Sequence, residues 1–241
     1  ATIEVHAGVQ VHLGKTGAWS TGQVDVPVGL EELRPDVGCG IFPAEPNGFV
    51  MLGSPIGSKP FMSKWCCERY KKVQELAAKL VVIDDPQMRW SLLKYCVEPR
   101  INHLLRNTPP DVTFQVATLH DKCMWDTTLA LLDIDSALAA EESQRLSNLS
   151  INHGGLGLRA ATRTRVAAYW GAWADCLHFV RSRFPALSAQ VHQHLHAGAT
   201  LIDSLFHLRT CHSTLLSEGA ILPTWDELFN GVRPEPIPEE E

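Results

Sequence analysis

The chain has 241 residues, of which 45% are hydrophobic and 20% are charged, and its formal net charge is −6. This length can bury one large core or two modest ones, and the composition is ordinary for a globular protein. The net charge excludes a uniformly basic nucleic-acid binder, and the lack of about 18 consecutive uncharged apolar residues excludes a transmembrane helix.

Residues 1–58 are predicted to be β-rich. Alternating apolar residues indicate strands at 3–5 and 9–13, and the apolar run from Phe49 to Leu52 indicates a third strand. Residues 20–47 contain Gly, Pro and acidic residues with little periodicity, which is typical of a long loop. Because the chain starts directly in a strand-like pattern, we expect it to begin partway through a domain.

From Lys59 onward the pattern becomes helical. One apolar stripe predicts the first helix: Phe61, Trp65, Tyr70, Val73, Leu76 and Leu80. The run Asp84-Asp85-Pro86 predicts the start of a second helix, which Pro99 is expected to kink. A third helix follows a Pro-Pro pair and is expected to extend towards Ala140, and a short helix is predicted at 141–149.

The C-terminal part is predicted to be helical as well. A Gly-rich turn at 152–157 precedes a long helix at 160–183, which Pro185 is predicted to close. Further helices follow between 187 and 226, and the last of these is short and capped. The acidic, Pro-containing tail at 233–241 is predicted to be disordered. The fold class is therefore α+β and predominantly α-helical, with a small antiparallel sheet at the start.

The distribution of charge along the chain and the spacing of the cysteines indicate where basic surface lies and in which compartment the protein occurs. The segment from Lys59 to Pro110 contains ten Lys/Arg and five Asp/Glu, a net charge of +5, so the rest of the chain carries −11. A second basic cluster consists of Arg159, Arg163, Arg165, Arg181 and Arg183. The seven cysteines show no C-x-x-C spacing, which favours reduced thiols in an intracellular protein of the nucleus or cytoplasm.

Two short motifs point to a function. Gly14-Lys15-Thr16 follows a strand-like run, and Leu52-Gly53-Ser54-Pro55-Ile56-Gly57 follows the third strand. Ordered similarities continue downstream over Phe61–Val82, Asp84–Gln87, Leu92–Cys96, Pro99–Arg100, Leu104–Pro110, Gly154–Arg159 and Ala167–Asp175. In this order, residues 8–178 resemble the end of the palm and the thumb of reverse transcriptases from non-LTR (LINE-like) retrotransposons.

The resemblance implies the primer-grip and thumb portion of an RNA-directed DNA polymerase, a nucleotidyltransferase. Lys15 would be the catalytic residue near the phosphates of the incoming nucleotide, where a cation stabilises developing charge. Leu52, Gly53, Ser54 and Pro55 would hold the 3′ end of the primer. Phosphates of the duplex would be contacted by Lys64, Lys71, Lys72, Arg100 and Arg106. The alternatives from the residues alone are a surface lysine, an ordinary strand end and a solvated helix face.

The aspartates that would bind the catalytic metals are not identifiable in this chain. Asp84-Asp85 is interpreted as a helix cap, because Pro86 follows at once and the pair comes after the Leu-Gly strand rather than before it. Two Mg²⁺ ions are implied for the intact polymerase and none for this portion, which is not expected to be active alone. The implied partners are an RNA/DNA template–primer duplex and the remainder of the polymerase, with no membrane.

The resemblance also divides the chain into four parts. They are a palm remnant with a long loop at 1–58, a thumb-like region at 59–150, a C-terminal helical region at 151–232, and the acidic tail at 233–241. The alternative function is a non-catalytic helical interaction or structural protein derived from a retroelement, which the acidic net charge favours mildly.

Two further patterns are interpreted as structural. Gly154-Gly155-Leu156-Gly157 is predicted to be a tight turn rather than a phosphate-binding loop, because no Lys-Ser/Thr follows it. No metal site is predicted. A zinc-binding helical domain remains a third hypothesis, which rests on His192, His194, His196, His207 and His212. Only His192 and His196 share a helix face, and no Cys or acidic ligand stands at a typical spacing nearby.

Overall fold

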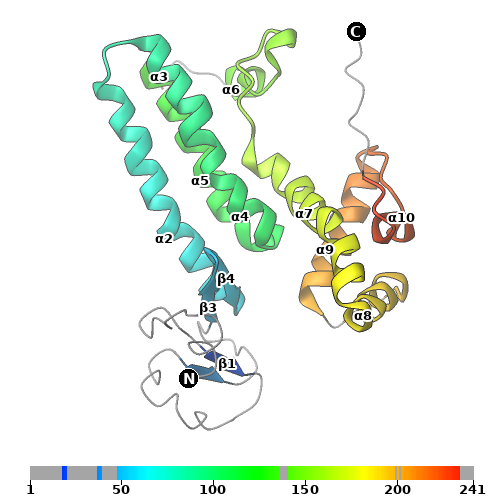
Figure 1. Ribbon diagram of the computed structural model, residues 1–241. Helices are drawn as coiled ribbons and strands as arrows, with labels where there is room; N and C mark the ends of the chain where they lie inside the picture. Colours follow the sequence, from blue (N-terminus) through cyan, green and yellow to red (C-terminus); the bar gives the residue numbers. More distant parts are fainter. Residues whose placement is uncertain are drawn as a thin grey trace, which may run out of the picture. The chain divides into compact units, whose positions relative to one another are not determined.

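The computed structural model describes residues 48–135, 141–198, 200 and 202–233, together with the backbone of 18–20 and 37–39. The chain divides into two compact units, Ala1–Trp65 and Cys66–Glu241. The fold is predominantly helical with a small antiparallel sheet near the N-terminal end, as the sequence predicts (Figure 1). The strands predicted at 3–5 and 9–13 lie outside the described residues, as does the tail from 234 onward.

Two pairs of short strands occur in the unit Ala1–Trp65. β3 (Gly48–Met51) and β4 (Ser54–Gly57) form the expected antiparallel hairpin. β1 (Ala18–Ser20) and β2 (Val37–Cys39) form a second pair, which is parallel rather than antiparallel. A parallel pair needs a connection of a dozen or more residues, and the segment between β1 and β2 provides it. β2 therefore lies inside the stretch that was predicted to be a loop.

The other elements of the described chain are helical. In chain order they are α2 (Lys59–Ala78), η3 (Lys79–Val82), α3 (Pro86–Leu92), η4 (Leu93–Val97), η5 (Glu98–Ile101), α4 (Asn102–Asn107), α5 (Pro110–Leu131), α6 (Glu141–Ser147), η7 (Ile151–His153), α7 (Ala161–Arg183), α8 (Pro185–His196), α9 (Asp203–Ser217) and α10 (Trp225–Phe229). Among the described residues, no helix is long and apolar enough to cross a membrane.

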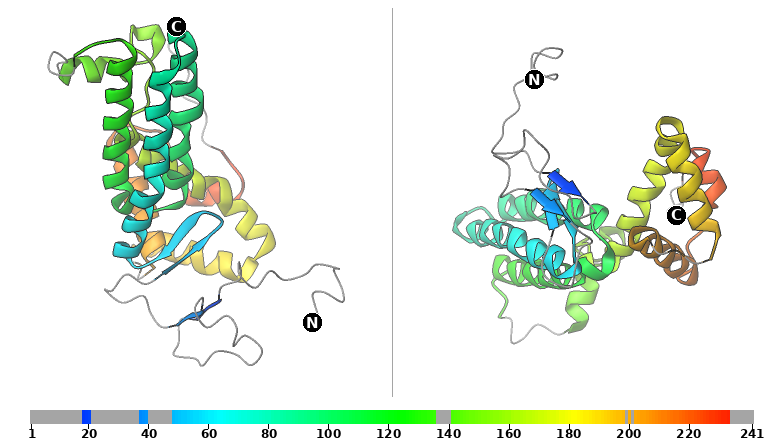
Figure 2. Two further views of the ribbon diagram at one scale, coloured as in Figure 1. Left: turned by 90° about the vertical axis from the view of Figure 1, so that its left-hand side faces the viewer. Right: turned by 90° about the horizontal axis from the view of Figure 1, so that it is seen from below.

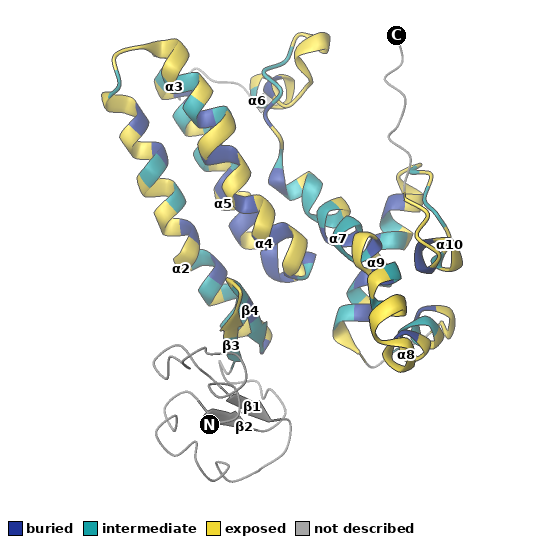
Figure 3. Cartoon of the chain, viewed as in Figure 1, coloured by how far each residue is buried: buried dark blue, intermediate teal, exposed yellow. Residues whose placement is uncertain are grey.

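α2 buries one side along its length. Cys66, Tyr70 and Ala77 are buried, and their spacing places them on one face of the helix (Figure 3). The predicted stripe contains Tyr70 but not Cys66 or Ala77, because small side chains give a weak hydrophobic signal. Helices α2, α3 and α5 lie side by side (Figures 1 and 2). The first core is formed by buried residues of α2, η3, η4 and α5, with partly buried residues of α3 packed against it; the buried members are Ala77, Leu80, Leu93, Val97 and Met124.

The second helix begins where the sequence predicts and is irregular in its second half. The Asp85 side chain accepts hydrogen bonds from the backbone N–H groups of Gln87 and Met88 at 2.8 and 3.0 Å, which confirms the helix cap. Ahead of Pro99 the helix widens into the π-helical η4 and then tightens into the 3₁₀-helical η5. Pro99 lacks an N–H donor and its ring crowds the preceding turn, so the regular hydrogen-bond ladder is interrupted there.

One predicted helix end needs correction, and a second is confirmed. α5 ends at Leu131 rather than extending towards Ala140, and Asp133 has a left-handed backbone with φ of 55°. An α-helix does not continue through that conformation. Pro185 ends α7 as predicted and also begins α8, where it occupies the first helical turn. A single residue, Phe184, therefore separates the two helices.

α7 connects the first group of helices with the last. It packs against α4 and α5 and also against α8, α9 and α10. Its aromatic residues Tyr169 and Trp170 are buried in the second core. The other fully buried members are Ala174, Leu177, Leu195, Leu205, Leu208, Cys211, Leu215, Leu228 and Phe229.

No disulfide joins the six cysteines that the structure describes. Cys66 and Cys211 are buried, and this burial raises the pKa of the Cys66 thiol to about 12 and that of Cys211 to about 11. Both thiols are therefore uncharged at neutral pH. They pack as small apolar side chains.

Candidate nucleic-acid interface

The predicted primer-grip residues lie in and next to the turn of the β3–β4 hairpin. Leu52 and Gly53 form its two-residue turn, and both have positive φ, at 50° and 80°. This is the pattern of a type I′ turn, which matches the twist of the strands it connects. Ser54 and Pro55 begin β4 opposite Met51 and Val50. The structure thus brings all four predicted residues to one end of the hairpin.

The tip of this hairpin presents an apolar side chain to solvent. Leu52 is 92% exposed, whereas Pro55 is buried. Leucine is a strained choice at positive φ, where Gly, Asn or Asp is preferred. A turn built for stability alone would have another residue at position 52. The exposed leucine is therefore a candidate contact residue.

The base of the hairpin is fixed against the start of α2. At Gly48 an added Cβ would overlap the Phe61 ring and the carbonyl oxygen of Ile56. Only glycine lets the strand approach this closely. Ser58 is buried between β4 and α2, so a single residue connects the hairpin to the helix. The turn at Leu52-Gly53 therefore lies at the end of a short hairpin whose base packs against the start of α2.

The predicted phosphate contacts of α2 lie on its solvent side. Lys64, Lys71 and Lys72 are exposed, and spacings of seven and eight residues place them along one face (Figure 3). Among the described residues, none of these three lysines takes part in an ion pair or hydrogen bond that would neutralise it. Glu68 and Glu75 are exposed on the same helix and reduce the local positive charge. The exposed face of α2 therefore keeps a modest excess of positive charge.

The two arginines that were predicted to contact phosphates, Arg100 and Arg106, already make contacts within the protein. Arg106 in α4 forms an ion pair with Asp175 in α7, with 2.8 Å between Nη2 and Oδ2. Both side chains are about half exposed, so water screens this pair and a phosphate can compete with it. Arg100 is exposed, and its Nε donates to the carbonyl oxygen of Cys96 at 2.9 Å. The structure thus directs Arg106 towards α7, and among the predicted phosphate contacts the lysines of α2 are the better candidates.

The segment between the Gly-rich turn and α7, and the first residues of α7, are held by carboxylates. The Asp121 carboxylate accepts hydrogen bonds from the N–H groups of Ala161 and Thr162 at 2.6 and 3.0 Å. Glu98 accepts from the N–H of Arg159 at 2.5 Å and pairs with Lys94 at 2.8 Å. The amides at this helix start are therefore already used, which supports the structural interpretation over a phosphate site.

Sequence reasoning missed Asp121 as the residue that organises this turn. It lies in α5 between the buried residues Ala117 and Met124, at a spacing that places it on the inner face. A carboxylate on an inner face needs hydrogen-bond donors, and that is the signal the sequence contained. Its donors are 40 and 41 residues away in the chain, so the sequence did not identify them.

One arginine of the second basic cluster lines a pocket instead of the open surface. The Arg165 guanidinium lies 4.9 Å from the centre of the Phe114 ring, a cation–π contact between α7 and α5. Across the same pocket, His207 of α9 approaches Asp111 of α5 at 3.5 Å. Arg165 is thus used in packing α5 against α7 and is a poor candidate for a phosphate contact.

Lys15, the predicted catalytic residue, lies outside the described residues. Comparison of the chain with protein-family models, curated proteins and solved structures found no match.

Proposed function

We propose that this chain is the primer-grip and thumb portion of an RNA-directed DNA polymerase and that it holds a template–primer duplex. The observation that carries the proposal is the hairpin with an exposed Leu52-Gly53 turn, which leads through one residue into a helix with free lysines. This arrangement has the chain order that the resemblance implies. The rest of the polymerase would supply the metal-binding aspartates, and the protein would act inside the cell.

The chemistry of the interface fits a backbone contact without sequence readout. Lysine ammonium groups bind phosphates as point charges and do not distinguish bases. The net charge of −6 repels nucleic acid at long range, so binding must come from the local excess of cations on α2. We therefore expect a weak, strongly salt-dependent interaction in the absence of the rest of the enzyme.

The test is binding of the complete chain to a fluorescently labelled DNA primer annealed to an RNA template. Affinity is measured by anisotropy at several salt concentrations. We expect the double variant Lys71→Glu/Lys72→Glu to bind about tenfold or more weakly and its slope of log affinity against log salt to be shallower by about 1 to 2. Lys122→Glu is the matched control, because Lys122 is exposed on α5 and pairs with Asp126.

The same binding experiment also tests whether the β3–β4 hairpin recognises the 3′ end of the primer. We expect a duplex with a recessed 3′ primer end to bind better than a blunt duplex, and Leu52→Glu to remove that preference by placing a negative charge near the primer phosphates. Absence of duplex binding at low salt, or equal loss in the Lys122→Glu control, would contradict the proposal. Either result would favour the alternative, a non-catalytic helical interaction protein.

A further inference from the structure

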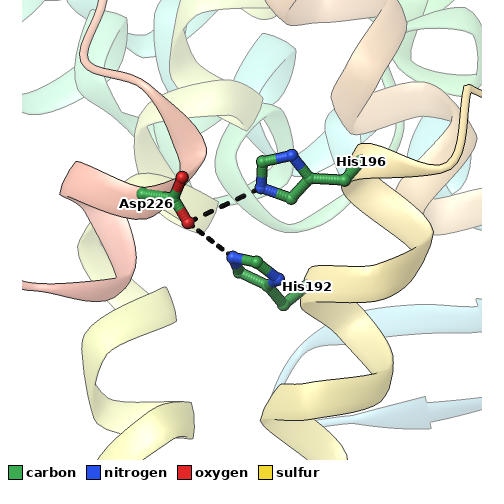
Figure 4. Close-up of side chains that lie close together, drawn as sticks. All are labelled: His192, His196 and Asp226. Atoms are coloured by element: carbon green, nitrogen blue, oxygen red, sulfur yellow. Dashed lines mark hydrogen bonds and ion pairs between the residues drawn. The ribbon is translucent and has the colours of Figure 1, made fainter.

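Two histidines and an aspartate from separate helices converge at the surface of the second helical group. His192 and His196 lie one turn apart at the end of α8, and Asp226 lies in the first turn of α10 (Figure 4). The Oδ1 atom of Asp226 is 2.6 Å from Nε2 of His192 and 3.7 Å from Nε2 of His196. One potential ligand atom from each residue lies within 4.8 Å of the other two.

Neighbouring contacts hold the carboxylate in this position. Thr224 and Glu227 form a reciprocal capping box around the first turn of α10, with Glu227 Oε2 accepting from the Thr224 N–H at 2.7 Å. The end of α10 is fixed by a hydrogen bond from Arg181 of α7 to Asn230. Asp226 therefore projects from a short helix that is fixed at both ends.

The histidines are positioned by packing as well. The His192 ring lies edge to face with the buried Phe229 ring, with 5.0 Å between the ring centres. The centres of the His192 and His196 rings are 4.3 Å apart, and the Nε2 atoms of both rings face the Asp226 carboxylate (Figure 4). The three side chains remain 41 to 65% exposed, so an ion can reach them from solvent.

We propose that His192, His196 and Asp226 bind one Zn²⁺ ion that joins α8 to α10. In a tetrahedral zinc site with bonds of about 2.0–2.1 Å, ligand atoms are about 3.3–3.4 Å apart. The two distances from Asp226 lie on either side of this value. The distance between the two imidazole nitrogens is within 4.8 Å, so a zinc ion would draw the two rings together and move the His192 nitrogen away from the carboxylate oxygen.

The donor set selects the class of ion. Two imidazole nitrogens and one carboxylate oxygen suit Zn²⁺ and related transition metals, whereas Mg²⁺ and Ca²⁺ prefer oxygen ligands alone. Metal binding requires each ligating Nε2 atom to offer its lone pair and therefore to be without a proton. Three protein ligands leave the fourth position of a tetrahedral site for water. This inference departs from the sequence-based expectation of no metal, and it is independent of the proposed nucleic-acid contacts of α2.

The test is a Zn²⁺ titration of the complete, tag-free chain after dialysis against EDTA, followed by calorimetry. We expect one equivalent to bind and to raise the thermal midpoint Tm, because the ion binds only the folded state. The variants His192→Ala, His196→Ala and Asp226→Asn should each weaken binding by at least about tenfold, since each removes a ligand.

His194→Ala is the matched control, because His194 lies on the same helix and contacts Thr200 instead. It should bind Zn²⁺ as the wild type does, and circular dichroism should show that every variant is folded. A Co²⁺-loaded sample gives a second readout, in which a visible absorption band is expected for the wild type and His194→Ala but not for His196→Ala. The proposal is wrong if no stoichiometric binding occurs, or if the three variants bind Zn²⁺ as tightly as the control.

Discussion

The helices α2 to α5 and the helices α7 to α10 bury different kinds of side chain. In the first group Thr108, Thr113, His120 and Thr128 are completely buried, and Glu98 is nearly so. In the second group the described core is almost wholly apolar, and Ser188 is its buried polar residue. Stability in the first group therefore depends on hydrogen-bond partners and charge states in addition to apolar burial. In the second group it depends on the amount of apolar surface removed from water.

The largest effect should come from a cavity in the apolar core. Leu208 of α9 is completely buried, so Leu208→Ala removes packed methyl groups and leaves a void. We expect the free energy of unfolding to fall by about 3–5 kcal/mol, measured by urea denaturation. Leu216→Ala on the same helix is the control, because Leu216 is 47% exposed and should change stability by less than about 1 kcal/mol. Similar losses for both variants would contradict the assigned core.

The next effect should be a pH dependence of stability that centres on His120 of the first group. Burial lowers the pKa of His120 from 6.5 to about 4, and neither ring nitrogen has a hydrogen-bond partner among the described residues. The unfolded chain therefore takes up a proton at a higher pH than the folded chain. Stability that is present above pH 6.5 is lost as pH falls towards 4, by on the order of 3 kcal/mol.

His120→Phe separates this effect from the rest of the titration. Phenylalanine keeps the edge-to-face contact with Tyr70, whose ring centre is 5.6 Å away, and does not titrate. We expect urea unfolding at pH 7 and pH 4.5 to show a smaller loss of stability in the variant than in the wild type. Equal losses in the two proteins would assign the acid sensitivity to other groups.

A smaller effect is expected at the carboxylate that joins α5 to α7. Asp121→Ala removes both hydrogen bonds to the backbone at the start of α7, which should cost about 2 kcal/mol of unfolding free energy. Asp126→Ala on the same helix removes an exposed pair with Lys122 and should cost less than about 0.5 kcal/mol. Hydrogen exchange should be faster at Ala161 and Thr162 in the first variant and unchanged in the second.

Helix starts and exposed helix faces could be predicted from the sequence, because they depend on residues that are close together in the chain. Asp85 and Pro86 define a helix start through bonds that span two and three residues, and Thr224 and Glu227 do the same for α10. The position of Lys64, Lys71 and Lys72 on the exposed face of α2 follows from their helical spacing alone. Each of these features is set by local backbone geometry, which a short window of sequence contains.

Features that join distant segments could not be predicted in this way. Asp226 is 34 residues from His192, and the two meet only because α8 and α10 both pack on α7. The sequence predicted an irregularity at Pro99, but periodicity did not reveal that it takes the form of a π-helical turn at η4 followed by the 3₁₀-helical η5. The pairing of Arg106 with Asp175 likewise requires the packing of α4 on α7.

The single residue between α7 and α8 has a mechanical consequence. The Phe184 N–H closes the last turn of α7, and its carbonyl oxygen accepts from Ser188 in the first turn of α8. α8 has twelve residues, is about 18 Å long, and leaves α7 at an angle that the backbone dihedrals of Phe184 set. A difference of about 10° in that angle would displace the far end of α8, where His196 lies, by about 3 Å. The angle at this corner therefore sets whether the two imidazoles and the carboxylate can meet.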